Sequence, residues 1–264
     1  MRQFAKAHAC GNDFLIVEGE CDRELAIKLC ARNTGVGADG IEFLEWTGER
    51  EGRIRLVNAN GSIAEISGNG TRCVAAWMAH RKNVQAGNSI VLETDAGRRD
   101  CRLVRVEGHR FEFASEMGIP VIQENQVTLA DGTQVAGVAI STGNPHFVIF
   151  VEDGTFRAYG RGWQALGYEI CSHAQFPDET NVEFVHVIDT NRIEIRIFER
   201  GVGPTSSSGT GTCATGAATI ARRGGDHHLL VRAPGGEQKF DWAGDGAEMT
   251  LTGPAELICV GEAW

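Results

Sequence analysis

The sequence lacks a long hydrophobic run, an excess of positive charge and closely spaced cysteine pairs. No apolar segment approaches the roughly 18 residues that a membrane-spanning helix needs, and the opening "MRQFAKAHACGNDF" contains no signal-peptide hydrophobic segment. We therefore expect a cytoplasmic protein with no membrane partner. The formal net charge of -10 argues against a nucleic-acid partner, because Lys and Arg supply most of the affinity for phosphates.

The eight cysteines are scattered along the chain, and no two of them form a CxxC pair. Such a pair would suggest a redox or metal motif. We therefore expect no metal site. Most of the thiols are expected to be reduced and buried, which is where unpaired cysteine usually lies.

The chain has 264 residues, 42% of them hydrophobic, which is enough for two domains with their own cores. Short runs rich in β-branched and aromatic residues predict strands. These runs are 13–20, 53–58, 89–94, 110–115, 146–152, 182–188, 192–198 and 255–260. Apolar residues at helical spacing predict helices at 22–32, 70–82, 160–170 and 211–223.

Two chemically similar stretches lie where the second and fourth predicted helices begin. "EISGNGTRCVAAW" covers Glu65–Trp77 and "SSGTGTCATGAA" covers Ser207–Ala218, and each offers a hydroxyl, a pair of glycines one residue apart, a threonine and a cysteine. The first N–H groups of a helix lack internal partners and carry partial positive charge, so a helix start can bind an anion. Two such starts could grip one α-carboxylate, with Ser67 and Ser208 leading the two turns. Alternatively, each serine only caps its helix.

The duplication divides the chain into two halves with one motif each. The turn-rich stretch 118–133 allows a boundary at its start. We predict an α+β protein with domains at 1–117 and 118–264, the last strand being able to return to the first domain. The two domains are expected to be pseudo-symmetric, with strands wrapped around a central helix and the active site in the cleft between them.

The order of the motifs resembles the diaminopimelate epimerase family. The matching stretches are "FAKAHACGNDF", "RNTGVGADG", "VNANGSIAEISGNGTRC", "STGNPHFVIFV", "FPDETNVEFVHV" and "FERGVGPTSSSGTGTCA". The resemblance implies an isomerase of lysine and peptidoglycan precursor synthesis that interconverts LL- and meso-diaminopimelate without pyridoxal phosphate or any other cofactor. It implies a two-base mechanism, in which one residue removes the α-proton and another returns a proton to the opposite face. A homodimer is also expected by resemblance.

The resemblance also assigns roles to individual residues. The positions that match the family's two catalytic cysteines hold Ser67 and Ser208, and His146 and Glu199 match the residues that assist those cysteines. Arg200 can pair with the distal carboxylate of the substrate in a bidentate fork. The expected substrate-binding residues are Asn12, Asn58, Gly68, Asn69, Asn144, Asn181, Glu199, Arg200, Gly209 and Thr210.

The two serines leave three functions open. A hydroxyl is a far weaker acid than a thiol and needs a base beside it to act near neutral pH. The chain can be an epimerase, a racemase or lyase acting on another amino acid, or a non-catalytic protein that binds diaminopimelate. Cys73 and Cys213 lie more than one helical turn beyond the serines, so we expect them in the core.

Overall fold

The computed structural model describes residues 1–64 and 66–264, which divide into two compact units. Unit 1 comprises Met1–Glu116 and Thr252–Trp264, and unit 2 comprises Met117–Leu251. The first residue of the motif predicted at 65–77 lies outside the described part of the chain.

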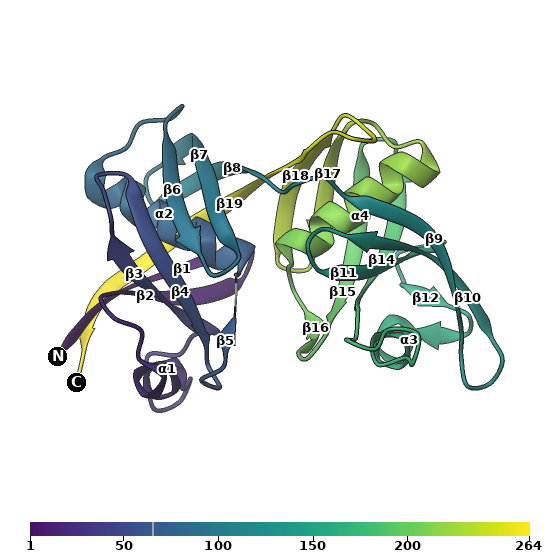
Figure 1. Cartoon of the computed structure of the whole chain (residues 1–264), viewed down its shortest axis with the longest axis horizontal. Helices are drawn as coiled ribbons and strands as arrows, with labels where there is room; N and C mark the ends of the chain where they lie inside the picture. Colours follow the sequence, from purple (N-terminus) through teal and green to yellow (C-terminus); the bar gives the residue numbers. More distant parts are fainter. Residues whose placement is uncertain (65) are drawn as a thin grey trace. The chain divides into compact units, whose positions relative to one another are not determined.

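The unit boundaries lie close to the predicted ranges 1–117 and 118–264, and the last strand makes the return to the first domain that the prediction had left open. The break lies one residue earlier, and the last strand, β19 (Met249–Ala263), belongs to unit 1 from Thr252 onward. Antiparallel pairing with β1 (Arg2–Ala9) accounts for this return. The two ends of the chain therefore lie side by side in unit 1 (Figure 1).

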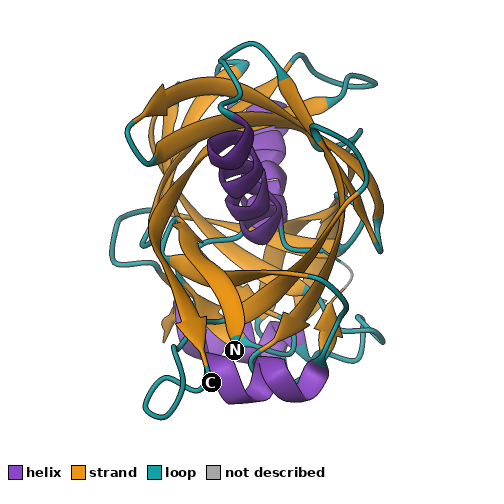
Figure 2. Ribbon diagram, turned by 90° about the vertical axis from the view of Figure 1, so that its left-hand side faces the viewer, coloured by secondary structure: helices purple, strands orange, loops and turns teal. Residues whose placement is uncertain are grey.

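Unit 1 is a strongly bent sheet that encloses a helix. Its elements are β1, β2 (Asn12–Glu18), α1 (Arg23–Cys30), β3 (Gly40–Trp46), β4 (Glu51–Asn58), β5 (Ile63–Ala64), α2 (Gly68–Lys82), β6 (Ser89–Thr94), β7 (Gly97–Glu107) and β8 (Arg110–Glu116). Strand β2 pairs in parallel with β3, β3 pairs antiparallel with β4, and β4 pairs in parallel with β6. Figure 2 shows the strands of unit 1 surrounding the central helix.

Unit 2 repeats this topology. Its elements are β9 (Val121–Thr128), β10 (Gln134–Ser141), β11 (Pro145–Val151), β12 (Arg157–Ala158), β13 (Arg161–Gly162), α3 (Trp163–Cys171), β14 (Asn181–Asp189), β15 (Arg192–Glu199), β16 (Gly203–Thr205), α4 (Gly209–Arg223), β17 (His228–Ala233) and β18 (Gly236–Trp242). Strand β11 pairs in parallel with β14, β14 pairs antiparallel with β15, and β15 pairs in parallel with β17. The prediction of two α+β domains with similar topology is confirmed.

The predicted elements are present with shifted ends. All eight predicted strands and all four predicted helices correspond to elements of the structure. The stretch 118–133, predicted as turn-rich, contains the strand β9. Val127 and Leu129 from this stretch are buried in a hydrophobic cluster of unit 2, so their burial outweighs the turn-forming composition around them.

The central helices α2 and α4 are buried on nearly all sides. Every residue from Asn69 to Ala76 in α2 is buried, as is every residue from Gly211 to Thr219 in α4. Cys73 and Cys213 are fully buried in the cores of their units, as predicted. Burial raises the pKa of the Cys73 thiol far above its usual range, which makes it a core residue rather than a proton carrier.

None of the helices in the described part of the chain has the length and apolar character that crossing a membrane requires.

Substituting Gly216 with alanine is expected to destabilise unit 2. The added methyl group would lie 2.2 Å from Phe240 Cδ1 in a packed core, and overpacking typically costs about 1–3 kcal/mol. Urea unfolding followed by tryptophan fluorescence measures the change. The matched control is Gly154→Ala, whose nearest new contact would be His186 Nδ1 at 3.8 Å. Equal shifts for the two variants would contradict the close packing of α4 on β18.

Candidate active site

The two motif helices begin with the same hydrogen-bond pattern. Ser67 precedes α2, and its Oγ accepts the N–H of Gly70 at 3.1 Å. Ser208 precedes α4, and its Oγ accepts the N–H of Gly211 at 3.2 Å. In both turns the serine carbonyl accepts the hydroxyl of the threonine four residues later at 2.7 Å. Both serines are therefore helix caps, and since a capping oxygen accepts, each hydroxyl hydrogen remains able to donate.

In unit 1 the predicted binding residues gather around the start of α2, whose first two residues are Gly68 and Asn69. The side chain of Asn69 donates to Asn12 Oδ1 at 3.3 Å, and Asn12 donates to Asp39 Oδ2 at 2.5 Å. Asn58, at the end of β4, lies opposite the residue after Asp39 in the sheet register. Hydrogen bonds thus join Asn69, Asn12 and Asp39 at one end of the sheet, and the residue after Asn58 donates its backbone N–H to the carbonyl of Asp39 at 2.9 Å.

A cluster of charged residues fixes the loop that carries Asn12. Asp13 contacts Lys6 Nζ at 3.0 Å and Arg32 Nη2 at 2.8 Å, and Arg32 also contacts Asp39 at 2.7 Å. Burial alone would raise the pKa of Asp13, but the hydrogen bonds and charges of Arg32 and Lys6 outweigh burial, so the pKa is lowered. The cluster keeps Asp39 in place as the acceptor for Asn12.

In unit 2 a line of hydrogen bonds connects the core to the start of α4. His146 Nδ1 lies 2.7 Å from Glu183 Oε1, and both side chains are fully buried. His146 Nε2 lies 3.0 Å from Asn144 Oδ1, and Asn144 donates to the hydroxyl of Thr210 at 3.4 Å. Gly209 and Thr210 are the first two residues of α4. Both ring nitrogens of His146 face oxygen atoms, so a protonated ring donates to both of them.

Glu199 lies beside Ser208. Burial of Glu199 and, to a smaller extent, the charge of the neighbouring Glu183 raise its pKa. A hydrogen bond with the Ser208 side chain and the nearby His146 lower it, and the net shift of the pKa is upward. A carboxylate with a raised pKa is a better base near neutral pH. This contact gives Ser208 the adjacent base that a hydroxyl needs.

Asn181 joins the two loops that carry His146 and Glu199. Its side chain donates to the carbonyl of Pro145 at 3.1 Å and accepts the backbone N–H of Arg200 at 3.1 Å. The exposed guanidinium of Arg200 donates to the carbonyl of Asp178 at 3.1 Å. All the predicted residues of unit 2 therefore belong to one connected group around Ser208.

Two buried glutamates that the sequence analysis missed lie beneath the first turns of the central helices. Glu42 on β3 is 1% exposed, and Glu183 on β14 is fully buried. A Cβ atom on Gly70 would lie 2.0 Å from Glu42 Oε1, and one on Gly211 would lie 2.9 Å from Glu183 Oε1. The glycines therefore leave space for the carboxyl groups. Each glutamate precedes its motif serine by 25 residues (42 to 67 and 183 to 208), a regularity that could have revealed both.

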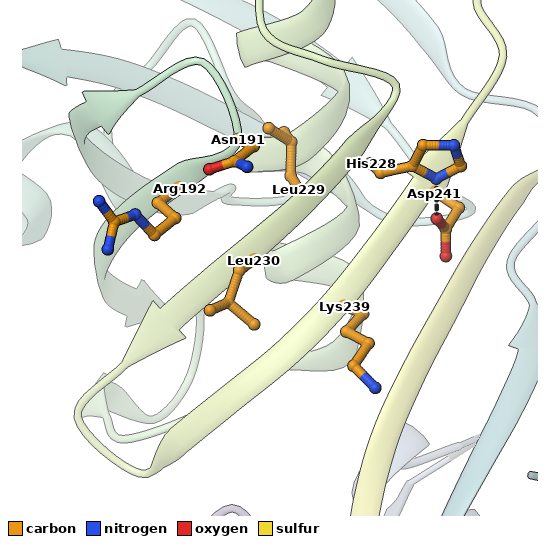
Figure 3. Close-up of a pocket in the computed structure, with 7 residues that line it drawn as sticks. All are labelled: Asn191, Arg192, His228, Leu229, Leu230, Lys239 and Asp241. Carbon is orange, nitrogen blue, oxygen red and sulfur yellow. Dashed lines mark hydrogen bonds and ion pairs between the residues drawn. The ribbon is translucent and has the colours of Figure 1, made fainter.

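A shallow depression of about 310 Å³ lies elsewhere on unit 2 (Figure 3). It is formed by β17, β18 and the start of β15, and His228 and Asp241 form an ion pair at its edge. Its lining residues are Asn191, Arg192, His228, Leu229, Leu230, Lys239 and Asp241. These residues are separate from the predicted site, and the depression does not contribute to it.

Within residues 1–64 and 66–264, no group of three or more His, Cys, Asp or Glu side chains is arranged to hold a metal ion.

The charge cluster in unit 1 is expected to make stability depend on pH. Because the folded-state pKa of Asp13 is lowered, its contribution is present above the unfolded value of 3.8 and is lost as pH falls through the folded value. Asp13→Asn should therefore unfold at lower urea than the parent at neutral pH, and the difference should vanish below the folded pKa. The control is Asp245→Asn, in an exposed turn. A difference that persists unchanged in acid would contradict this role.

The diaminopimelate epimerase family model matches residues 4–122 and 138–258. The diaminopimelate epimerase of Desulforudis audaxviator is 35% identical over 286 residues, covering 98% of each chain. That of Corynebacterium glutamicum is 35% identical over 273 residues, covering 98% of this chain and 97% of the relative.

Two solved structures share the fold at low sequence identity. A phenazine biosynthesis protein of the PhzF family from Bacillus anthracis gives a TM-score of 0.75 at 16% identity, covering 100% of both chains. A probable proline racemase from Agrobacterium radiobacter gives a TM-score of 0.73 at 14% identity, covering 100% of this chain and 93% of the other. These two likenesses concern the fold. On the family match and the curated relatives, this chain belongs to the diaminopimelate epimerase family.

Proposed function

We propose that this chain is a cofactor-independent epimerase that interconverts LL- and meso-diaminopimelate by moving the proton at one α-carbon. Family membership supports the reaction type. The observation that carries the proposal is the Glu199 carboxylate beside Ser208, because it supplies the base without which a serine could not act as a proton carrier.

In the proposed reaction the two helix starts hold the α-carboxylate of the substrate. The N–H groups of the first turns of α2 and α4 provide partial positive charge that stabilises the carboxylate and the negative charge that develops when the α-proton leaves. This use of the helix starts requires both half-sites to act on the same α-carbon. The duplicated serine caps fit that requirement, since each half-site presents the same groups.

At the Ser208 half-site, Glu199 accepts the α-proton through the serine hydroxyl. The hydroxyl gives its proton to Glu199 as it takes the proton from carbon, so no free alkoxide forms. His146 assists by stabilising the charge of Glu183 and Glu199 from within the core. At the Ser67 half-site, the second serine delivers a proton to the opposite face of the carbanion.

The distal groups of diaminopimelate are assigned to the residues around Arg200. Its exposed guanidinium is available for a carboxylate, and Asn181 holds the backbone of Arg200 in place. On the unit 1 side we assign Asn12, Asn58 and Asn69 to polar groups of the same ligand. By family resemblance we also propose a homodimer located in the cytoplasm.

The reaction is tested by proton NMR of LL-diaminopimelate incubated with the protein in deuterated water. We expect slow loss of the α-proton signal with the parent protein. The double variant Ser67→Cys with Ser208→Cys should exchange faster by roughly 10²-fold or more, because thiols are better proton carriers at neutral pH and each positioned carrier contributes about that much. Each single variant should gain far less, since both faces need a carrier.

The matched control is Ser172→Cys, which adds a thiol at the exposed end of α3. Two outcomes would contradict the proposal. If neither the parent nor the double variant exchanges the α-proton while calorimetry shows that both bind diaminopimelate, the chain is a binding protein. If the parent instead turns over another amino acid rapidly, the serines serve a racemase or a lyase.

A further inference from the structure

The two half-sites are built on equivalent pairs of parallel strands. In unit 1, Phe14 of β2 pairs with Gly40 of β3. In unit 2, His146 of β11 pairs with Asn181 of β14. Two residues further along β3 and β14 stand the buried glutamates. By this register Glu42 is the counterpart of Glu183, and Phe14 is the counterpart of His146.

The equivalence exposes one difference between the half-sites. Glu183 has its partner, because His146 lies 2.7 Å away. Glu42 lacks such a partner, because the position in unit 1 that corresponds to His146 is occupied by Phe14. Neither oxygen of the Glu42 carboxyl has a hydrogen-bond partner in the part of the chain that the structure describes. An ionised carboxylate in this setting would be a buried charge without compensation.

The groups around Glu42 do not compensate such a charge. Its neighbours in the sheet register are Ile16 on β2 and Leu56 on β4. From α2 the titratable group that faces it is the Cys73 thiol, whose pKa is raised partly by this glutamate. The residues before and after Glu42 belong to the cluster packed against α1, on the other face of the sheet. Burial raises the pKa of Glu42 to about 8, so the carboxyl holds a proton at neutral pH.

Glu42 and Ser67 both contact Gly70. The Ser67 hydroxyl accepts the Gly70 N–H at 3.1 Å, and Glu42 Oε1 occupies the space where a Cβ atom of Gly70 would stand. The missing side chain lets the carboxyl lie directly against the first turn of α2. The fully buried, unpartnered carboxyl therefore lies at the start of the same helix turn as the serine.

We propose that Glu42 is the proton store of the Ser67 half-site, the acid that matches the base Glu199 at the Ser208 half-site. This inference rests on the proposed epimerase reaction. Glu42 turns about Gly70 to reach the serine, and because it acts through Ser67 it does not itself touch the substrate.

The proton transfers balance without an oxidant or a reductant. When the carbanion is protonated, its electron pair forms the new C–H bond with the hydroxyl proton of Ser67. The O–H bond of Glu42 breaks as its proton moves to Ser67, which leaves Glu42 ionised and the serine neutral. Meanwhile Glu199 has gained the original α-proton through Ser208. Exchange of one proton with solvent at each carboxyl, or one turnover in the reverse direction, restores the starting state.

The test compares the parent with Glu42→Gln, which keeps the size and neutral polarity of the protonated acid but cannot release the proton. We expect epimerisation of LL-diaminopimelate to fall by roughly 10²-fold or more, the usual contribution of a positioned acid. The parent rate should decline as pH rises through about 8, where Glu42 loses its proton, and this decline should be absent from the residual activity of Glu42→Gln. The comparison variant is Glu183→Gln, which changes the buried glutamate that has a histidine partner. The residual epimerisation rate of this variant should still decline near pH 8, because Glu42 is unchanged.

Infrared spectroscopy provides a second readout on the parent protein. A carbonyl band of a protonated carboxylic acid should be present at pH 7, should disappear above about pH 8, and should be missing in Glu42→Gln. The parent pH profile and this band test the inference even if the variant fails to fold.

Three results would overturn the inference. The first is a Glu42→Gln variant that epimerises at the parental rate with the parental pH profile, which leaves the proposed function intact. The second is a parent protein without the band at pH 7. The third is a parent protein that epimerises nothing, which removes the proposed function together with this role of Glu42.

Discussion

Each unit has to provide hydrogen-bond partners for the first-turn N–H groups of a helix that is buried on nearly all sides. The position of the candidate site follows from this constraint. A helix start exposed to solvent can leave its N–H groups to water, but α2 and α4 begin inside sheets that surround them. Ser67 and Ser208 meet part of the requirement as caps. The remaining N–H groups form an electropositive position that favours a carboxylate ligand. The residues that cap the two helices are therefore the same ones to which we assign the carboxylate of the substrate.

The same enclosure explains the small residues of the motif. Glycine at positions 70 and 211 lets a buried carboxyl group lie directly against each helix, where any side chain would collide with it. The two carboxyl groups then differ because their neighbours differ. Glu183 has His146 at 2.7 Å, whereas Glu42 lies between Ile16 and Leu56 in the sheet register and has a pKa that burial raises. The repeated fold has a histidine on β11 and a phenylalanine at the matching position of β2, so one buried glutamate has a partner for its Oε1 and the other has none within the described residues.

Much of the fold could be predicted from the sequence, because helices and half-buried strands have strong local patterns. Strand β7 was missed because its charged residues obscure the alternation of Cys101 and Leu103, which are fully buried. Strand β3 was missed because Glu42 interrupts an apolar run, and glutamate ordinarily indicates an exposed position. The pairing of β19 with β1 joins the two ends of the chain, so no local pattern could reveal its register. The motif resemblance named residues that the structure connects around each serine, but the partner of each buried glutamate depends on strand register, which a single sequence does not give.

The central claim is that two different groups handle the proton on the two faces of the α-carbon. It is tested most directly by following LL-diaminopimelate in deuterated water at early conversion and measuring deuterium separately in the remaining substrate and in the meso product by mass spectrometry. The account predicts product that carries deuterium at the inverted α-carbon and remaining substrate that carries none. Product that retains the original α-hydrogen would mean that a single group moved the same proton from one face to the other, and it would contradict the account.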